Sequence, residues 1–391
     1  MVESSDEWFQ RYKFCQPLGQ GGMGIIYLAE DKRSNNGPCV VKQLISKYID
    51  PEEHQEAVRL FQREASLLRR FDHPGIVRFF DDHITEDGKY FLVMDYVPGK
   101  NLDSIVATYG PFNSEATVEI AIQCCEVLEY LHEQEPPIIY RDLKPSNLML
   151  TPEGQIVFID FGIARSFMPK QSATRVVTAG YSPPEQYFGK PETRSDLYAL
   201  GATLGHLLTG QRPKPLSVSA PRFVNKDVML TLDDLVRRLT AHSPEDRPIS
   251  AREVRYELYR IYHEIHPDFE IPQEAQISQR KRLNLSPRRG VISDSAFCPE
   301  DDEQQEFSAE HAQKITRDHM QRLSSDRLKK SKNEQVRRPP PRSEQKPARA
   351  RLKNVDPSQF DSYTALPRQR RRNKSNGFFT KLKDWWDQIT S

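Results

Sequence analysis

The strongest constraint on the fold is a change in the spacing of apolar residues about a quarter of the way along the chain. From residue 12 to residue 95 the pattern favours short strands rich in Val, Ile, Tyr and Phe, interrupted by one helical stretch at 53–70. After a connector at 98–101, helical spacing appears over residues 114–132, 194–208, 232–239 and 249–263. The sequence therefore predicts a small lobe of sheet and one helix at 12–95, followed by a larger helical lobe at 100–265.

The composition changes beyond about residue 267, where Gln, Ser, Arg, Lys and Pro dominate. Residues 321–391 carry 19 Lys and Arg against 7 Asp and Glu, although the formal net charge of the whole chain is only +1. Such a segment buries too little apolar surface to offset its ordering entropy. We therefore expect residues 268–375 to form a disordered basic tail. At 376–391 we expect an amphipathic helix, with one side formed by Phe378, Leu382, Trp385, Trp386 and Ile389.

The cysteines and the first residues bear on the cellular compartment. The five cysteines form no CxxC pair and have no histidine close enough to complete a zinc site, so we expect reduced structural thiols. The first ten residues carry acids without an apolar run, and no run of 18 apolar residues occurs. These features predict neither a signal peptide nor a spanning helix, and they favour a cytoplasmic protein.

Residues 19–26 read Gly-Gln-Gly-Gly-Met-Gly-Ile-Ile, a GxGxxG pattern between two predicted strands. Glycines let the backbone approach phosphate oxygens without a side-chain clash. Taken alone, the motif also fits a glycine-rich hairpin, while a dinucleotide-binding fold would need a helix to begin at the third glycine. A β-branched strand at 25–29 follows instead, which favours a flap that closes over a nucleotide.

Lys42 ends the apolar strand Cys39-Val40-Val41-Lys42. A buried ammonium group needs a charged partner, because without one it costs several kcal/mol or loses its proton. Glu64, on the following amphipathic helix, is a candidate partner. The alternative is a lysine on an edge strand whose amino group reaches water.

Two runs carry the most specific signal: residues 139–150 read IYRDLKPSNLML and residues 156–162 read IVFIDFG. In this order and spacing the motifs resemble the protein kinase family, in particular bacterial serine/threonine kinases of the kind found in cyanobacteria. The resemblance continues through TAGYSPPE at 178–185 and SDLYALG at 195–201, and it covers residues 12–265. It implies an α+β, two-lobed protein kinase fold that uses ATP with Mg²⁺ or Mn²⁺.

The resemblance also implies roles for four residues of the large lobe. Phosphoryl transfer depends on positioning: metal ions on the triphosphate, ligands for those metals, and a carboxylate directed at the incoming hydroxyl. By resemblance, Asp142 orients that hydroxyl and accepts its proton, and Lys144 lies near the transferred phosphate. Asn147 and Asp160 bind the metal ions.

Further residues are implied as nucleotide contacts in the small lobe and at its boundary. Lys42, braced by Glu64, would hold the α- and β-phosphates. Met94 would lie at the back of the adenine pocket, with Asp95 and Val97 supplying backbone hydrogen bonds to the adenine edge. The other expected contacts are Leu18, Gly19, Gln20, Gly21, Gly22, Met23, Gly24, Ile25, Ile26, Val40 and Met149.

The chain departs from the family pattern at three places. Tyr140 stands where most members have histidine, and we expect its ring to fill the same slot without loss of activity. Val40 replaces the usual alanine above the adenine and adds two methyl groups to a tight pocket. Residues 210–231 are Pro-rich and weakly patterned where many members have a helix that binds partners, so we expect unusual substrate selection.

Regulation is implied by Arg141, which precedes the catalytic carboxylate. In the family such an arginine pairs with a phosphorylated residue of the activation segment, here 166–178, and orders it. Ser172 and Thr174 are the candidate phosphosites, while a segment ordered without modification remains the alternative. Thr178 is better interpreted as a contact of the catalytic aspartate and Lys144, with autophosphorylation there left open.

Three residues are implied as stabilising elements, namely Glu185, Asp196 and Arg247, with Arg247 paired to Glu185. The leading functional hypothesis is an ATP-dependent serine/threonine kinase acting on protein substrates. The rival hypothesis is a pseudokinase that recruits partners through its tail. The enzyme is favoured because the phosphate-binding lysine, the catalytic aspartate and both metal ligands are all present.

The end of the tail suggests a further partner. A basic run at 368–374 beside the predicted helix suits an anionic membrane surface, which would place the protein at the inner membrane face. A protein partner that binds residues 366–391, the large lobe of the same chain included, fits equally well. Nucleic acid is the least favoured partner, and a homodimer is left open.

Overall fold

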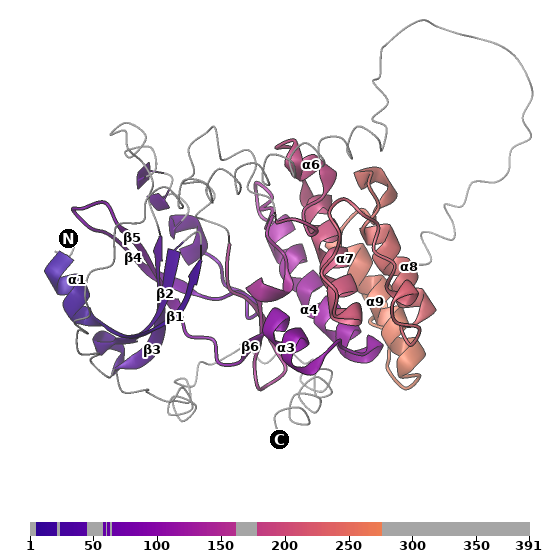
Figure 1. The fold of residues 1–391 in the computed structure, drawn as a ribbon, viewed down its shortest axis with the longest axis horizontal. Coiled ribbons are helices and arrows are strands. Elements are labelled where there is room, and N and C mark those ends of the chain that lie inside the picture. The colour runs from indigo at the N-terminus through magenta and orange to yellow at the C-terminus, as the bar shows by residue number, and fades with distance from the viewer. Residues whose placement is uncertain are drawn as a thin grey trace, which may run out of the picture. The chain divides into compact units, whose positions relative to one another are not determined.

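The computed structural model describes residues 5–21, 24–44, 58–59, 61–62, 65–161 and 178–275 (Figure 1). The predictions for Gly22, Met23, Glu64, Ser172 and Thr174, and for the tail at 276–391, lie outside these residues. Within them, a sheet-based small lobe is followed by a helical large lobe. The predicted fold class is therefore confirmed.

A five-stranded antiparallel sheet with the order β1-β2-β3-β5-β4 forms the small lobe. Its strands are β1 (Tyr12–Gly21), β2 (Gly24–Asp31), β3 (Gly37–Leu44), β4 (Phe79–Ile84) and β5 (Tyr90–Asp95), and the turn η1 (Lys32–Ser34) lies between β2 and β3. The described residues of the predicted helix at 53–70 include 58–59, 61–62 and 65–69, all helical. Phe61, Ala65 and Leu68 are buried in one core with Leu44 and Tyr90 of the sheet, as their helical spacing predicts.

A helix that the sequence did not reveal, α1 (Ser5–Arg11), packs on the other face of this sheet. Trp8 is 1% exposed and stacks on His83 with ring centroids 4.9 Å apart. Arg11 forms ion pairs with Asp31 at 2.9 Å and Asp81 at 3.1 Å. Seven residues make less than two helical turns, which is too short for apolar periodicity to show.

The large lobe is built around α4 (Ser114–His132), which lies against α7 (Thr193–Thr209) and α9 (Ala251–Ile265), while α8 (Leu230–Leu239) packs on α7 (Figure 1). Two shorter helices are α3 (Leu102–Tyr109) and α6 (Pro184–Tyr187). The helix α4 has the predicted limits, and its N-cap Asn113 accepts a hydrogen bond from the amide of Ala116 at 2.8 Å. The limits of α7, α8 and α9 differ from the predicted ones by at most two residues.

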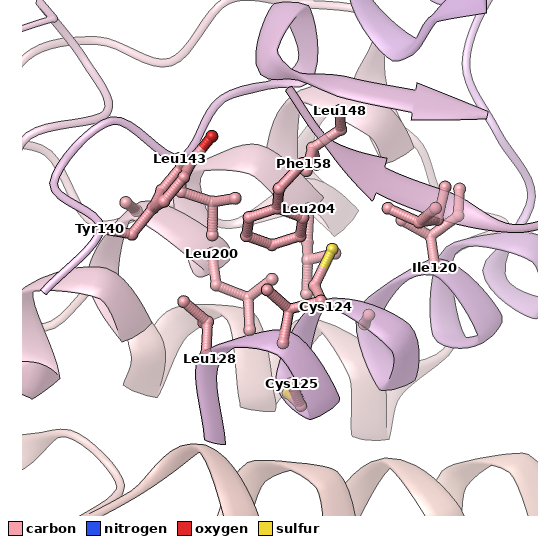
Figure 2. Close-up of a cluster of buried hydrophobic side chains, with 14 of the residues drawn as sticks. Ile120, Cys124, Cys125, Leu128, Tyr140, Leu143, Leu148, Phe158, Leu200 and Leu204 are labelled. Carbon is pink, nitrogen blue, oxygen red and sulfur yellow. The ribbon is translucent and has the colours of Figure 1, made fainter. Parts of the chain in front are cut away.

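A second sheet carries the loop with the most specific motifs. It consists of β6 (Lys100–Asn101), β7 (Leu148–Leu150) and β8 (Ile156–Phe158), with the turn η2 (Pro145–Asn147) leading into β7. Figure 2 shows the side chains of Leu143, Leu148 and Phe158 beside Leu200 and Leu204 of α7, and all five are fully buried. The loop is thereby anchored at both ends to the core of the large lobe.

Two stretches of the large lobe bear on expectations from the sequence. Residues 210–229 contain one short 3-10 helix, η4 (Pro221–Phe223), in keeping with their Pro-rich pattern, and η5 (Pro244–Asp246) precedes α9. The composition places residues 268–275 in the disordered tail, yet the ring of Phe269 lies 5.0 Å from that of Tyr262, and Ala275 is 1% exposed. The packed part of the large lobe therefore extends to residue 275, further than predicted. The sequence did not reveal this extension because the few apolar residues that anchor it show no periodicity.

In the part of the chain that the structure describes, no helix combines the length and the apolar character needed to cross a membrane.

Candidate active site

The Asp142 carboxylate lies at the centre of a hydrogen-bonded group and is almost fully buried. Lys144 Nζ lies 3.2 Å from Oδ1 and 3.0 Å from Oδ2. Asn147 Nδ2 donates to Oδ2 at 3.0 Å and to the main-chain carbonyl of Asp142 at 2.9 Å. The hydroxyl of Thr178 donates to Oδ1 at 2.8 Å. These contacts hold the carboxylate in one orientation, and they include the contact between Asp142 and Thr178 that the sequence predicted.

Asp196, at 0% exposure, shapes the backbone that carries this group. Its two carboxylate oxygens accept the amides of Tyr140 and Arg141, both at 2.8 Å, and His132 Nε2 lies 2.9 Å from it. Arg141 adopts φ of 66°, a left-handed conformation that is costly for a side chain of its size. Gln186 donates to the Arg141 carbonyl at 3.0 Å. The strained turn is thus held by partners on both its amide and its carbonyl.

Lys42 and Asp160 bring the two lobes together. Lys42 is 7% exposed, and its Nζ lies 2.8 Å from Asp160 Oδ1. The amide of Ile159 donates to the carbonyl of Asn147 at 3.1 Å, so Asp160 follows directly on a residue fixed to the loop that carries Asp142. The predicted partner of Lys42, Glu64, lies outside the described residues, and the structure shows Asp160 as a partner of the lysine.

The oxygens of Asn147 and Asp160 suit a magnesium ion. The amide nitrogen of Asn147 is used on Asp142, which leaves the amide oxygen as the acceptor end of that side chain. Carboxylate and amide oxygens are the hard ligands that magnesium prefers, and it commonly takes the rest of its coordination from phosphates and water. Within the described residues no group of three or more His, Cys, Asp and Glu could hold a metal ion alone. The two oxygen donors would leave most of the coordination of a magnesium ion to phosphates and water.

The glycine-rich motif is a hairpin between β1 and β2. Gly19 pairs with Ile26 and Gln20 with Ile25 across the two strands, so a strand and not a helix begins at Gly24. This geometry excludes the dinucleotide-binding alternative. Gly24 has φ of 155°, and a Cβ atom there would lie 2.0 Å from the carbonyl oxygen of Gln43. Only glycine fits this position, which keeps the hairpin close to β3.

The residues predicted to surround adenine lie on strands of both lobes. Val40 on β3 is paired with Met94 on β5, and Met94 is 6% exposed. Met149 lies on β7 and is half-buried, while Leu18 on β1 is 46% exposed. The amide of Asp95 donates to the carbonyl of Arg78 at 2.9 Å. Asp95 and Val97 lie at the end of β5 and just beyond it, where the chain passes from the sheet to the large lobe.

Tyr140 fills the slot that the sequence assigned to it. Its ring is 3% exposed and meets Phe158 and Phe161 edge to face, with centroids 5.0 and 5.1 Å away. Phe161 in turn contacts Phe71 and Phe79, at 5.3 and 6.3 Å. Burial raises the pKa of the Tyr140 hydroxyl well above its usual value, so the group stays neutral. The ring joins the loop that carries Asp142 to a row of aromatic side chains.

The predicted pair between Glu185 and Arg247 is present. Two guanidinium nitrogens of Arg247 lie 2.7 and 3.1 Å from the two carboxylate oxygens of Glu185. The Arg247 side chain is 0% exposed and also donates to the carbonyls of Ala241, His242 and Arg194. The Ser195 hydroxyl donates to Glu185 at 2.7 Å. Glu185 and Arg247 thus connect α6 to the loop that precedes α9.

The packing below Thr178 is a feature that the sequence did not predict. The Tyr181 hydroxyl lies 2.8 Å from His206 Nδ1, and both side chains are buried. Gly180 has φ of 90°, and a Cβ atom there would lie 2.2 Å from the carbonyl oxygen of Pro213. The Pro-rich stretch after α7 therefore supports the segment that carries Thr178. These contacts join residues that are distant in the sequence, so no local sequence pattern predicts them.

Comparison with known protein families gives one match over most of the chain. The model described as "Protein kinase domain" matches residues 12–332. A curated relative in Mycobacterium leprae, serine/threonine-protein kinase PknB, is 33% identical over 273 residues, covering 64% of this chain and 43% of its own length. PknA of Nostoc sp., also named a serine/threonine-protein kinase, is 34% identical over 262 residues, covering 62% of this chain and 46% of its own. The chain thus spans less than half of these relatives.

Solved structures agree with the fold. The kinase domain of Mycobacterium tuberculosis PknI superposes with a TM-score of 0.52 at 27% identity, covering 66% of this chain and 97% of that one. The structure titled "PpkA-294 apo form" superposes with a TM-score of 0.56 at 25% identity, covering 66% of this chain and 99% of that one.

Proposed function

Because the chain belongs to the protein kinase family, we propose that it transfers the γ-phosphoryl group of ATP to serine and threonine hydroxyls of protein substrates. The resemblance to bacterial serine/threonine kinases that the motifs predict is confirmed, and the relatives include cyanobacterial proteins. One observation carries the proposal: the buried Asp142 carboxylate is oriented by Thr178, Lys144 and Asn147. Such positioning is what phosphoryl transfer requires from a protein.

The catalytic roles follow from this arrangement. Asp142 accepts a hydrogen bond from the substrate hydroxyl, directs its oxygen at the γ-phosphorus and takes up its proton as the new oxygen–phosphorus bond forms. The bond from the γ-phosphorus to the β–γ bridging oxygen breaks in the same transfer, and ADP leaves. Lys144, whose ammonium group lies 3.0 Å from the carboxylate, offsets the negative charge of the transferred group. Thr178, which follows residues 162–177, helps to orient the Asp142 carboxylate through the hydrogen bond that its hydroxyl donates.

The nucleotide roles remain those implied by the sequence. Lys42 binds the α- and β-phosphates, and Asn147 and Asp160 hold the metal ion. When bound, Mg²⁺ or Mn²⁺ neutralises charge on the phosphate oxygens. The ion pair between the buried Lys42 and the partly exposed Asp160, at 2.8 Å, supports this assignment because the group proposed to bind phosphate lies beside a group proposed to bind metal. The hairpin at 19–26 covers the phosphates, and Val40, Met94 and Met149 line the adenine pocket.

Control by phosphorylation is part of the proposal. Arg141 would form an ion pair with a phosphate group carried by Ser172 or Thr174, as the sequence predicts. Glu64 would brace Lys42 in the active state. Residues 162–177 lie outside the described chain, so the support comes from the motif. A Thr174→Ala variant that keeps full activity and full phosphate incorporation would remove Thr174 from this role.

Transfer from radiolabelled ATP tests the function. We expect the purified chain with Mg²⁺ to label itself and a protein acceptor, and Asp142→Asn to abolish labelling. Asp246→Asn, the same change at an exposed aspartate of η5, is the matched control and should label normally. If none of the three proteins labels an acceptor, the chain is either a kinase that awaits an activator or the pseudokinase that recruits partners, and nucleotide binding separates the two.

The proposed activity requires ATP, so we also propose that the chain acts in the cytoplasm. The basic run and the predicted helix at 366–391 would then bind an anionic membrane surface or a protein. Sedimentation with anionic vesicles separates these partners. Unchanged vesicle binding after deletion of residues 366–391 would contradict the membrane assignment.

A further inference from the structure

The small-lobe sheet is apolar on both faces. One face packs on the main core through Leu44, Tyr90, Leu92 and Met94. Along each strand, alternate side chains point to the opposite face, and there a second buried cluster forms. Its sheet members are Tyr12, Ala29, Cys39, Val41, Phe91 and Val93. An antiparallel sheet with one solvated face normally carries polar residues on that side. The outer face is therefore built to be covered.

The helix α1 covers only part of this outer face. Trp8 is buried over His83 and Phe91, whereas Phe9, the next residue, is 41% exposed. Beside it lies an open groove of about 420 Å³. Its aromatic walls and charged rim are formed by Phe9, Phe14, Tyr27, Phe91, Asp87 and Lys89. Among the described residues, α1 is the only helix that packs on this face.

The rings around the groove are arranged for contact with another aromatic group. Phe14 meets Tyr27 edge to face with centroids 5.1 Å apart, and Phe9 meets Phe91 in the same way at 5.5 Å. Such sets gain further stability when one more ring or indole packs at an edge or face. At the rim, Asp87 and Lys89 pair at 2.6 Å with more than half of each side chain exposed. A ligand that carries both a positive and a negative group can form ion pairs with Asp87 and Lys89 in place of the ion pair between these two residues.

We propose that residues 376–391 of the same chain bind in this aromatic groove. The segment places Phe378, Leu382, Trp385, Trp386 and Ile389 on one side of the predicted helix, with lysines and aspartates opposite. A helix of this length is marginal in water by itself, so its formation needs an apolar surface. The groove supplies that surface, with aromatic walls for the tryptophans and one charge of each sign at its rim.

The chain between the two parts is long enough for this contact. Residues 276–375 form a connection of about 100 residues, and a flexible chain of that length has a root-mean-square span of roughly 50–60 Å. The tail therefore reaches the groove and binds at an effective concentration that a separate molecule lacks. A second copy fits less well, because a symmetric contact would set one groove against another and fill neither. The inference does not depend on the proposed catalytic activity.

Photo-crosslinking in the full-length chain tests the contact. Trp386→p-benzoylphenylalanine places the reactive group in the tail, and after irradiation of dilute protein mass spectrometry locates the linked residue. We expect links within one chain to Phe9, Phe14, Tyr27 or Phe91. Removing one aromatic anchor, by Phe9→Ser, should lower their yield about tenfold. The matched control is Phe223→Ser, because Phe223 is 75% exposed on the large lobe; this change should leave the yield unaltered.

A second variant separates binding from folding. Gln43→Arg keeps every groove aromatic and places a charged side chain against them, so it should also lower the yield while the melting temperature stays unchanged. A yield that survives both Phe9→Ser and Gln43→Arg overturns the proposal. So do links confined to the large lobe, links between heavy-isotope and light chains, links formed only to lipid in phosphatidylglycerol vesicles, and the absence of any link.

Discussion

The orientation of the Asp142 carboxylate depends on a few individual hydrogen bonds. Three side chains from two segments hold it: Lys144 and Asn147 from its own loop, and Thr178 from beyond the undescribed residues 162–177. The first two are close in sequence, so their spacing alone predicts them. The third depends on the turn after Thr178, in which the amide of Tyr181 donates to the Thr178 carbonyl and Gly180 lies against Pro213. The Thr178 contact is therefore the more sensitive to the state of the large lobe.

Thr178→Val should slow phosphoryl transfer while leaving nucleotide binding intact. The change keeps the shape of the side chain but removes the hydroxyl that donates to Asp142 at 2.8 Å. A small misplacement of a catalytic group costs on the order of a hundredfold in rate, so we expect kcat to fall about ten- to a hundredfold. Steady-state kinetics should show an unchanged KM for ATP, and Thr178→Ser should restore the rate. Full kcat in Thr178→Val would contradict the positioning role.

His206 should make the stability of the domain fall in mild acid. Burial lowers the pKa of this histidine below its ordinary value of 6.5. As the pH drops, the unfolded chain therefore takes up the proton first, so this stability is complete above about pH 6.5 and is lost below it. Thermal unfolding between about pH 7.5 and pH 5.5 should show a smaller loss in His206→Gln than in the natural chain.

The partner of His206 offers the control for this pH dependence. Tyr181→Phe removes the hydroxyl that lies 2.8 Å from the ring nitrogen but leaves the histidine buried. The pH dependence should therefore persist in Tyr181→Phe. Equal slopes in the natural chain and His206→Gln would show that another group is responsible.

Among the structural elements, α1 and the connection between α6 and α9 stabilise the two lobes from outside the site. The sequence predicted α4 to the residue because Val118, Ile122, Cys125 and Leu128 repeat at helical spacing over five turns. It missed α1 because that helix is short and owes its position to the outer face of the sheet. Propensity and periodicity describe a segment alone, whereas Trp8 is buried by strands that follow it in the chain.

Trp8→Ala should destabilise the domain by about 3–5 kcal/mol, the usual cost of truncating a large buried aromatic. The side chain is 1% exposed between α1 and the sheet. The matched change is Phe9→Ala, which removes a neighbouring ring that is 41% exposed and should cost much less. Urea unfolding of both variants provides the comparison. Equal midpoints for the two would mean that α1 does not pack on the sheet in solution.

Arg247→Ala should be similarly costly, at about 3–5 kcal/mol, because it leaves Glu185 largely buried without its partner. Arg212→Ala is the control: that arginine pairs with Asp103 at 3.2 Å, but its side chain is 77% exposed. Exposed pairs contribute roughly 0–1 kcal/mol, so its midpoint should hardly move. A loss in Arg212→Ala as large as that in Arg247→Ala would refute the distinction between the buried and exposed pairs.

Across the whole molecule, several contacts between the lobes lie at the proposed site, while others join residues 71–73 to Tyr130 of α4. Lys42 meets Asp160, Ile76 bridges to Phe158, and Phe161 lies among rings of both lobes. The motifs predicted the two-lobed fold, the contact of Asp142 with Thr178 and the pair of Glu185 with Arg247, because the family imposes a fixed order of short local patterns. They did not predict the ion pair of Lys42 with Asp160, whose residues are 118 positions apart. Such contacts follow from how the lobes pack.

The most direct test of the account is to identify the amino acid that receives the phosphate. Three acceptor peptides that differ only in Ser, Thr or Tyr at one position would be incubated with the full chain, ATP and Mg²⁺, and analysed by mass spectrometry. The account predicts phosphate on the serine and threonine peptides, none on the tyrosine peptide, and none on any of them with Asp142→Asn. Phosphate on tyrosine alone, or equal transfer by Asp142→Asn, would contradict it.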